Sequence, residues 1–190
     1  MKFNFESIKI FLKTFIEEFD KRYVVRGLID GSLSTLGVVI GASTGSASII
    51  IAAGIGGGIA NGISNILGAL TAERAMIEEE RSYKEKNLLM EEGYLKKTSE
   101  YKVKLEKSAY CGIYDGISTI IGSVIPVVPF FIAPPAEAII LAIILTLIIL
   151  FILGIYIGRL SRENLMVAGL KMVAGGVIVA IISKIVEGSF

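Results

Sequence analysis

Residues 138–157 read AIILAIILTLIILFILGIYI, a run in which Ile and Leu predominate and no charged residue occurs. An α-helix needs about 20 apolar residues to cross the hydrocarbon core of a bilayer. This stretch therefore predicts a membrane-spanning helix. The whole chain of 190 residues has the same character, because 53% of it is hydrophobic and its mean hydropathy is +0.71. A chain this apolar is typical of a polytopic membrane protein.

Four further stretches are long and apolar enough to cross a membrane. The five spans are expected near 24–44, 47–70, 109–131, 136–158 and 165–187. Pro126 and Pro129 predict a kink or break toward the far end of the third span. Pro134 and Pro135 predict the turn into the fourth. We therefore expect an all-α polytopic membrane protein with five transmembrane helices.

Lys and Arg are distributed unevenly around these spans. They are frequent in 1–26, 73–107 and 159–164, and they are absent from the loops around 44–48 and 131–136. Because Lys and Arg are enriched in cytoplasmic loops, the N-terminus is predicted to be cytoplasmic and the C-terminus external. The expected location is the cell membrane, with the lipid bilayer as the surroundings.

Two parts of the chain are polar enough to lie outside the bilayer. Residues 1–22 carry Phe and Ile at helical spacing between Lys and Glu, which predicts an amphipathic helix. It would lie on the inner membrane surface or pack on the protein's own cytoplasmic helices. Residues 71–107 predict a short cytoplasmic helical hairpin that turns at Gly93, between spans two and three. It is inserted in a transmembrane domain that covers 23–190.

Several kinds of chemistry are excluded by residues that the sequence lacks. There is no histidine, and Cys111 is the only cysteine, which excludes imidazole ligands, an intramolecular disulfide and a multi-cysteine metal site. The formal net charge of +1 implies no global attraction to nucleic acid. No phosphate-binding Gly-Lys-Ser/Thr loop and no nucleophile–base arrangement occurs, so we expect neither ATP-driven pumping, nor an enzyme, nor a permanently bound cofactor.

Two segments repeat one pattern of Gly and Asp. Residues 27–31 (GLIDG) lie near the start of span one, and residues 112–116 (GIYDG) lie near the start of span three. Internal repeats of this kind occur in many secondary transporters. A carboxylate inside a membrane helix is costly unless it has a partner, so Asp30 and Asp115 are candidates for a functional site. The alternative is that each Asp caps a helix start or pairs with Arg26 or a nearby Lys.

Other oxygen-bearing side chains stand near these two acids. Ser and Thr lie one turn beyond each Asp, and span two adds Asn61 and Asn65. Carboxylate, amide and hydroxyl oxygens suit hard or borderline divalent ions such as Mg²⁺, Ca²⁺, Mn²⁺ and Fe²⁺. We therefore expect a metal site in the membrane formed by Asp30, Asp115, Asn61 and Asn65.

A second group of acids lies in the expected hairpin. Glu73, Glu78 and Glu80 would be placed to collect cations before these enter the membrane. The alternative is a solvated hairpin without metal. Lys and Arg are interleaved with the acids in similar number, and pairs such as Glu80 with Lys84 have ordinary i,i+4 spacing.

Motifs in three of the expected spans occur in a characteristic order. They are RGLIDG at 26–31 with GVVIGA at 37–42, ANGISNILG at 60–68, and IPVVPF at 125–130. Together they resemble the vacuolar iron transporter (VIT) family over about 22–187. The resemblance implies a homodimer that exports Fe²⁺ or Mn²⁺ from the cytoplasm in exchange for protons, with the ion passing Asp30. The family often has a Glu and a Met in span two, and Gly57 and Asn65 occupy those positions here.

The expected function is therefore transport of a divalent metal cation, iron or manganese. The rival is a non-transporting membrane scaffold or metal sensor that acts through the hairpin. The positions of the polar groups discriminate between them. Transport requires Asp30, Asp115 and one of the two Asn side chains to face one cavity, whereas a scaffold would have them face separate neighbours.

Overall fold

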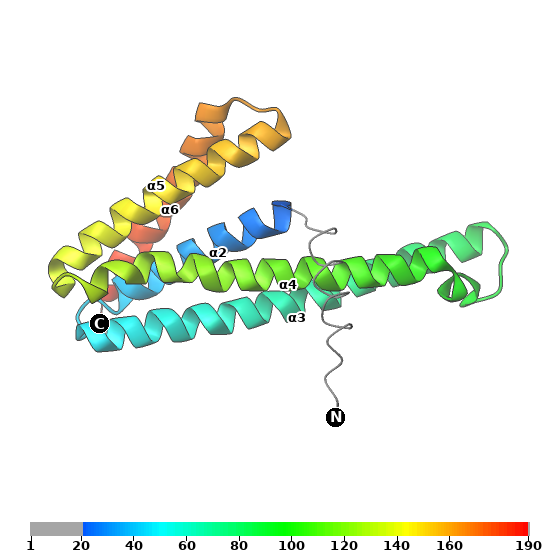
Figure 1. Cartoon of the computed structure of the whole chain (residues 1–190), viewed down its shortest axis with the longest axis horizontal. Helices are drawn as coiled ribbons and strands as arrows, with labels where there is room; N and C mark the ends of the chain where they lie inside the picture. Colours follow the sequence, from blue (N-terminus) through cyan, green and yellow to red (C-terminus); the bar gives the residue numbers. More distant parts are fainter. Residues whose placement is uncertain (1–20, 190) are drawn as a thin grey trace, which may run out of the picture.

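The computed structural model describes residues 21–189 (Figure 1). In this range the regular elements are all helices: α2 (Lys21–Gly41), α3 (Ala47–Asn87), η1 (Tyr94–Lys97), α4 (Ser99–Val127), η2 (Val128–Phe131), α5 (Pro135–Ser161) and α6 (Leu165–Glu187). Five of them are long and apolar enough to cross a membrane. The expected all-α fold with five spans is confirmed. The amphipathic helix expected over 1–22 lies outside the described residues, except that its last two residues begin α2.

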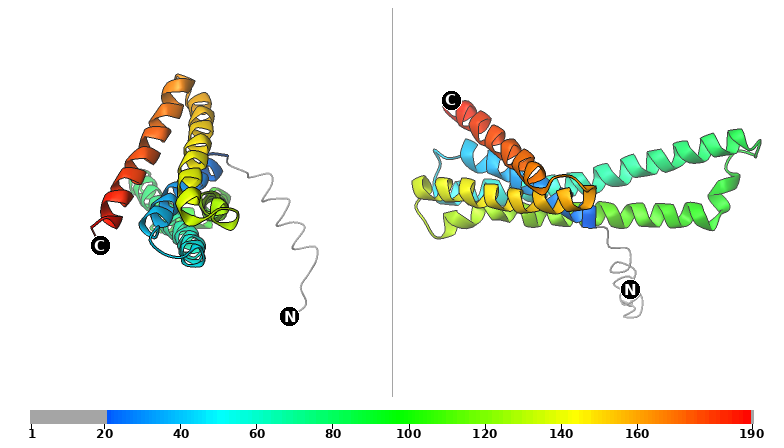
Figure 2. Two further views of the ribbon diagram at one scale, coloured as in Figure 1. Left: turned by 90° about the vertical axis from the view of Figure 1, so that its left-hand side faces the viewer. Right: turned by 90° about the horizontal axis from the view of Figure 1, so that it is seen from above.

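The hairpin forms because spans two and three continue into it as unbroken helices. α3 has 41 residues, which at 1.5 Å per residue makes it about 60 Å long, twice the thickness of the hydrocarbon core. Gly93 lies in the turn with a φ of +83°, a conformation that glycine adopts at no steric cost. Figure 2 shows α3 and α4 extending together beyond the other helices. The continuous second span and the turn at Gly93 match the expectation.

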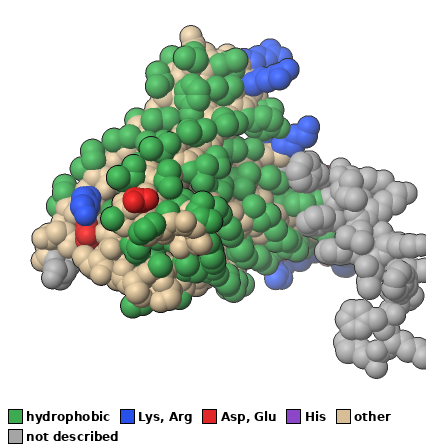
Figure 3. All heavy atoms as spheres, turned by 60° about the vertical axis from the view of Figure 1, so that its left-hand side comes forward, with side chains coloured by type: hydrophobic (Ala, Val, Ile, Leu, Met, Phe, Trp, Pro, Cys, Tyr) green, Lys and Arg blue, Asp and Glu red, His purple; other side chains and the backbone are tan. Residues whose placement is uncertain are grey.

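The five spans form a group of three and a group of two. α2, α3 and α4 run alongside one another, whereas α5 and α6 form a pair whose connecting loop stands away from that group (Figure 1). A buried hydrophobic cluster joins the two groups near the end opposite the hairpin. Its members are Leu36, Val39, Ile40, Ile50, Val127, Phe130, Ala138 and Ala142. Hydrophobic side chains cover most of the face seen in Figure 3, as expected for helices in contact with lipid.

Glycines allow the helices of the three-helix group to approach closely. A methyl group on Gly27 or Gly31 of α2 would overlap backbone oxygens of α4. Gly58 and Gly62 of α3 face the same helix, where a methyl group would overlap the side chains of Ser123 and Ile120. Small residues four apart are a common device for close helix packing in membranes. These glycines therefore fix how α2 and α3 are rotated against α4.

Replacing Gly31 with alanine should destabilise the protein by about 2 kcal/mol, because the added methyl group meets the backbone of Thr119, which cannot rotate away. Gly56→Ala is the matched control, since a Cβ there meets no atom within 4 Å. Its gain in helix propensity, about 1 kcal/mol, should leave stability unchanged or raised. The measurement is the temperature at which half of the monodisperse peak is lost in size-exclusion chromatography. Equal transition temperatures for the two variants would contradict the close packing.

Candidate functional site

Asp30 is held between α2 and α3 by two amide side chains. Nδ2 of Asn61 donates a hydrogen bond of 2.9 Å to Oδ2 of Asp30, and Nδ2 of Asn65 donates one of 2.6 Å to the same oxygen. The two Asn residues are four apart on α3, so they share one face of that helix. Within residues 21–189, Oδ1 of Asp30 accepts no hydrogen bond. One carboxylate oxygen is thus fixed and the other is available.

Both Asn side chains extend this arrangement to neighbouring hydroxyls. Nδ2 of Asn61 also donates to Oγ of Ser34 at 3.0 Å, and Nδ2 of Asn65 donates to Oγ1 of Thr119 at 2.9 Å. Asp30, Ser34, Asn61, Asn65 and Thr119, here called the Asp30 cluster, therefore join α2, α3 and α4. Thr119 is buried, the acid and both amides are half-buried, and Ser34 is exposed. The cluster thus reaches the surface of the single chain.

Asp115 has a different partner. Nε of Arg26 donates to Oδ1 of Asp115 at 3.1 Å, and Nη2 donates to Oδ2 at 2.5 Å. The Asp115 side chain is 2% exposed, whereas that of Arg26 is 60% exposed. Two parallel bonds of this kind make a strong, oriented pair. Asp115 thus pairs with Arg26, as in the alternative to a metal-binding role. Asn61 and Asn65 donate to Asp30 and not to Asp115.

The two copies of the repeated pattern give their acids different neighbours, because each of the three helices packs against both of the others. In residues 27–31 the glycines face α4, and Asp30 faces α3. In residues 112–116 the glycines face α3, and Asp115 faces α2. In both copies the glycines contact one neighbouring helix and the acid contacts the other. The two copies are therefore equivalent locally but are not related as two halves of one site.

A second set of contacts crosses the same three helices on the hairpin side of the Asp30 cluster. The hydroxyl of Tyr23 donates to Oε1 of Glu73 at 2.9 Å, and the guanidinium of Arg26 lies 5.1 Å from the centre of the Tyr23 ring. With the bond from Arg26 to Asp115, these contacts tie α2 to both α3 and α4. Sequence reasoning missed Tyr23. Tyr23 could have been found from its position three residues before Arg26 at the start of a span, where interfacial aromatic residues are common.

A cavity of about 510 Å³ opens beside this set of contacts, where the first turn of α2 lies against residues 73–80 of α3 and 104–111 of α4. Glu73, Met76 and Glu80 supply acids and a thioether to its wall. Cations supply the rest of its charge, from Arg22, Lys104 and Lys107. Charges of both signs therefore line this cavity.

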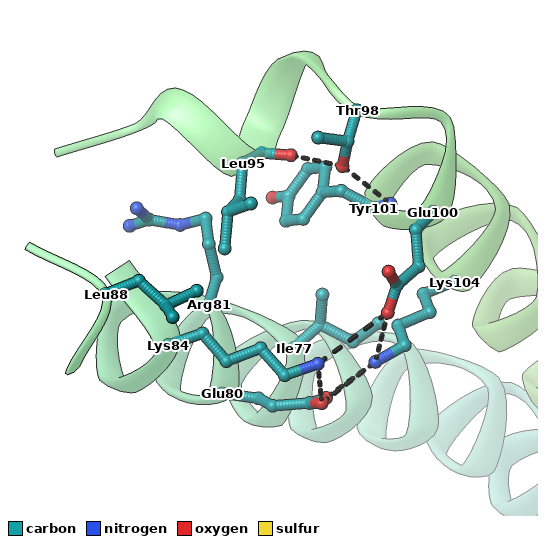
Figure 4. A pocket seen from close by; sticks show the side chains of 10 residues that line it. All are labelled: Ile77, Glu80, Arg81, Lys84, Leu88, Leu95, Thr98, Glu100, Tyr101 and Lys104. Atoms are coloured by element: carbon teal, nitrogen blue, oxygen red, sulfur yellow. Dashed lines mark hydrogen bonds and ion pairs between the residues drawn. The ribbon is translucent and has the colours of Figure 1, made fainter. Parts of the chain in front are cut away.

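Glu80 is paired with cations of the hairpin. Its carboxylate lies 2.8 Å from Nζ of Lys84 and 2.9 Å from Nζ of Lys104, and Lys104 also lies 3.4 Å from Glu100. Figure 4 shows these four side chains joined along one side of a cavity of about 310 Å³ between α3 and α4. In the described part of the chain, no three acids, histidines or cysteines are arranged to hold a metal ion. These contacts agree with the alternative of a solvated hairpin.

Buried charge also fixes the tip of the hairpin. The carboxylate of Glu85 accepts backbone hydrogen bonds from Gly93 at 2.9 Å and Leu95 at 2.8 Å, and it pairs with Arg81. Nε of Arg81 also donates to Glu78 at 3.0 Å. Glu85 therefore closes the turn. Glu78, which was expected to be a metal ligand, contacts the same Arg81 that pairs with Glu85.

Acid should loosen the hairpin between about pH 4.5 and pH 2. The hydrogen bond from Tyr101, with smaller contributions from Lys96 and Arg81, lowers the pKa of Glu78 from 4.5 to about 2. A pKa that is lower in the folded state stabilises the fold above the unfolded value, and the contribution is lost as the pH falls through the folded value. Hydrogen exchange over 77–104, corrected for its intrinsic pH dependence, should therefore quicken in this window.

Glu78→Gln should raise hydrogen exchange in the hairpin at pH 7 and match the wild type near pH 2. Glu79→Gln is the matched control, because Glu79 is exposed and has no ion pair within the range that the structure describes. Equal protection of all three proteins at pH 7 would show that the contacts of Glu78 do not stabilise the hairpin.

The sequence matches the VIT family over residues 69–187, more than half of the chain. It is 57% identical over 125 residues to an uncharacterized protein of Methanocaldococcus jannaschii. That alignment covers 66% of this chain and 65% of the relative, so the match spans slightly less than two thirds of the relative's length. The region matched to the family contains the hairpin and α4 to α6.

Proposed function

Because the chain belongs to the VIT family, a family of membrane metal-ion transporters, we propose that it exports Fe²⁺ or Mn²⁺ from the cytoplasm in exchange for protons. The observation that carries the proposal is the Asp30 cluster, where a carboxylate meets amide and hydroxyl groups inside membrane helices. An ionisable residue at such a position marks an ion pathway. Oxygen ligands of these types suit the two proposed metals better than soft ions.

In this proposal the two oxygens of Asp30 have separate tasks. Oδ2 stays bonded to Asn61 and Asn65, which keeps the carboxylate oriented. Oδ1, which accepts no hydrogen bond within residues 21–189, meets the cation. A proton on the carboxylate removes the charge that holds the metal. Proton and metal therefore compete for one group, which is the coupling that exchange requires.

Asp115 serves this site indirectly. Arg26 lies one helical turn from Asp30, so an uncompensated guanidinium there would repel an arriving cation. The bidentate bond to Asp115 neutralises that charge. Asp115 thus acts as a positioning residue and not as a second metal ligand, in contrast to the site that the repeat led us to expect.

A homodimer would complete the site. Polar groups that face lipid are costly, and the Asp30 cluster reaches the surface with Ser34 exposed. The adjacent surface of α3 is open, because a Cβ on Gly57 would meet only Val38, at 3.7 Å, and one on Gly68 would meet nothing within 4 Å. Small residues let a second copy approach closely. We place the dimer contact on this α2–α3 surface, with the hairpin in the cytoplasm.

The test is metal flux into proteoliposomes, measured for Fe²⁺ and Mn²⁺ with and without an imposed pH gradient. The proposal expects flux that depends on the protein and rises with a gradient that drives protons the opposite way. A flux that is the same with and without the pH gradient would contradict proton exchange. No flux of either ion from folded protein would favour the scaffold or sensor role for the hairpin.

A further inference from the structure

An apolar groove lies between the first turns of α2 and the last turns of α5, away from the Asp30 cluster. Its volume is about 360 Å³, within the range of sites that hold small organic molecules. It is lined by Lys21, Val24, Val25, Ile152, Leu153 and Tyr156. The groove opens where the α5–α6 pair stands away from the three-helix group (Figure 1). In a membrane, a space at the ends of two spans faces lipid headgroups and the adjoining part of the acyl chains.

One cation, Lys21, lines this groove, and a second, Arg159, lies one turn beyond the lining residue Tyr156. Lys21 precedes Val24 by one turn on α2, and Arg159 follows Tyr156 by three residues on the same face of α5. Both cations lie at the hairpin end of the bundle and are exposed. Among residues 21–189 neither forms an ion pair, and the Tyr156 hydroxyl makes no hydrogen bond. Within the described residues, an apolar floor thus ends in two positive charges without an ion pair and a hydroxyl without a hydrogen bond.

We propose that this groove binds a phospholipid with an anionic headgroup. Its phosphate lies between Lys21 and Arg159 and accepts a hydrogen bond from Tyr156, and its acyl chain covers the apolar wall. Basic pockets between membrane helices on the cytoplasmic side recognise headgroups of this charge. A zwitterionic lipid would fill the same wall, but its own cation would oppose the two basic side chains. The bound lipid would bridge α2 and α5 where the structure leaves them apart.

The sequence contains no tryptophan, so a single introduced one reports on its own surroundings. Ile152→Trp places the reporter at the groove, at a position that is 57% exposed. Leu170→Trp, on α6 and also 57% exposed, is the matched control. Each full-length variant is reconstituted with phosphatidylglycerol or phosphatidylcholine brominated at the same acyl carbons. Because bromine depth is then equal, the ratio of quenching by the two lipids reports headgroup preference alone.

The proposal expects phosphatidylglycerol to be preferred severalfold at residue 152 and not at residue 170. Each cation near an anionic surface contributes about fivefold, so Lys21→Gln with Arg159→Gln should return the ratio at residue 152 to that at residue 170. Equal ratios at both positions would mean general enrichment of anionic lipid and would overturn the proposal. So would a preference that survives the double substitution, or a reporter that neither lipid quenches because another part of the chain fills the groove.

Discussion

Replacing Asp30 with asparagine should reduce metal flux at least about 100-fold and leave the protein folded. Groups that merely support metal ligands typically change metal affinity by about 10- to 100-fold when they are altered, and a ligand should matter more. Asparagine has nearly the shape of aspartate and still offers an acceptor to Asn61 and Asn65, so packing is retained. It can neither hold a divalent ion by charge nor exchange a proton at neutral pH.

The measurement is the initial rate of Mn²⁺ flux under an imposed pH gradient, with size-exclusion profiles as a check on folding. Glu79→Gln is the matched control, because it removes a carboxylate from the same chain at an exposed hairpin position. It should transport as the wild type does. If Asp30→Asn transports Mn²⁺ at the wild-type rate, the protein is a transporter in which the Asp30 cluster does not bind the transported ion.

The spans could be predicted closely because the bilayer imposes their length. The fifth was expected over 165–187 and forms at Leu165–Glu187, and the fourth differs by a few residues at its ends. Backbone groups inside lipid must bond within one helix, so a long apolar stretch has few alternatives. The first span ends at Gly41, three residues before its expected end, because Ser and Gly follow in 43–46 and form a turn.

The site was harder to predict because partners depend on how each helix is rotated. Residue types and spacing indicated Asp30, Asn61 and Asn65, and these three side chains do meet. The same pattern placed Asp115 beside them, but the glycines of 112–116 face α3 and turn its carboxylate toward α2. Sequence alone shows that two copies exist. It does not show which neighbouring helix the acid of each copy faces.

Glu85 illustrates the same limit in the hairpin. Glu85 lies seven residues from both Glu78 and Glu92, a spacing that in the sequence indicates one shared helical face of acids. In the structure it is buried and accepts bonds from the turn at 93–95, which is eight or more residues away. A carboxylate that closes a turn and one that binds a metal look alike in a sequence. Only the position of the loop amides distinguishes them.

Removing Arg26 should destabilise the protein more than removing Arg26 and Asp115 together. Arg26→Gln leaves the carboxylate of Asp115, which is 2% exposed, without its partner. Breaking a buried pair from one side costs about 3–5 kcal/mol, and the low end applies because the Arg26 side chain is 60% exposed. Asp115→Asn should cost less, since the guanidinium can still reach water. The double variant should recover most of the stability that Arg26→Gln loses.

This double-mutant cycle also decides whether Asp115 binds the metal. Thermal transitions in detergent give the coupling between the two residues, and Mn²⁺ flux in liposomes gives their part in transport. If Asp115 only neutralises Arg26, the double variant should be stable and should transport, because neither an unpaired cation nor an unpaired acid remains near Asp30. A double variant that is as stable as the wild type but does not transport would make Asp115 a second ligand, as the repeated sequence first indicated.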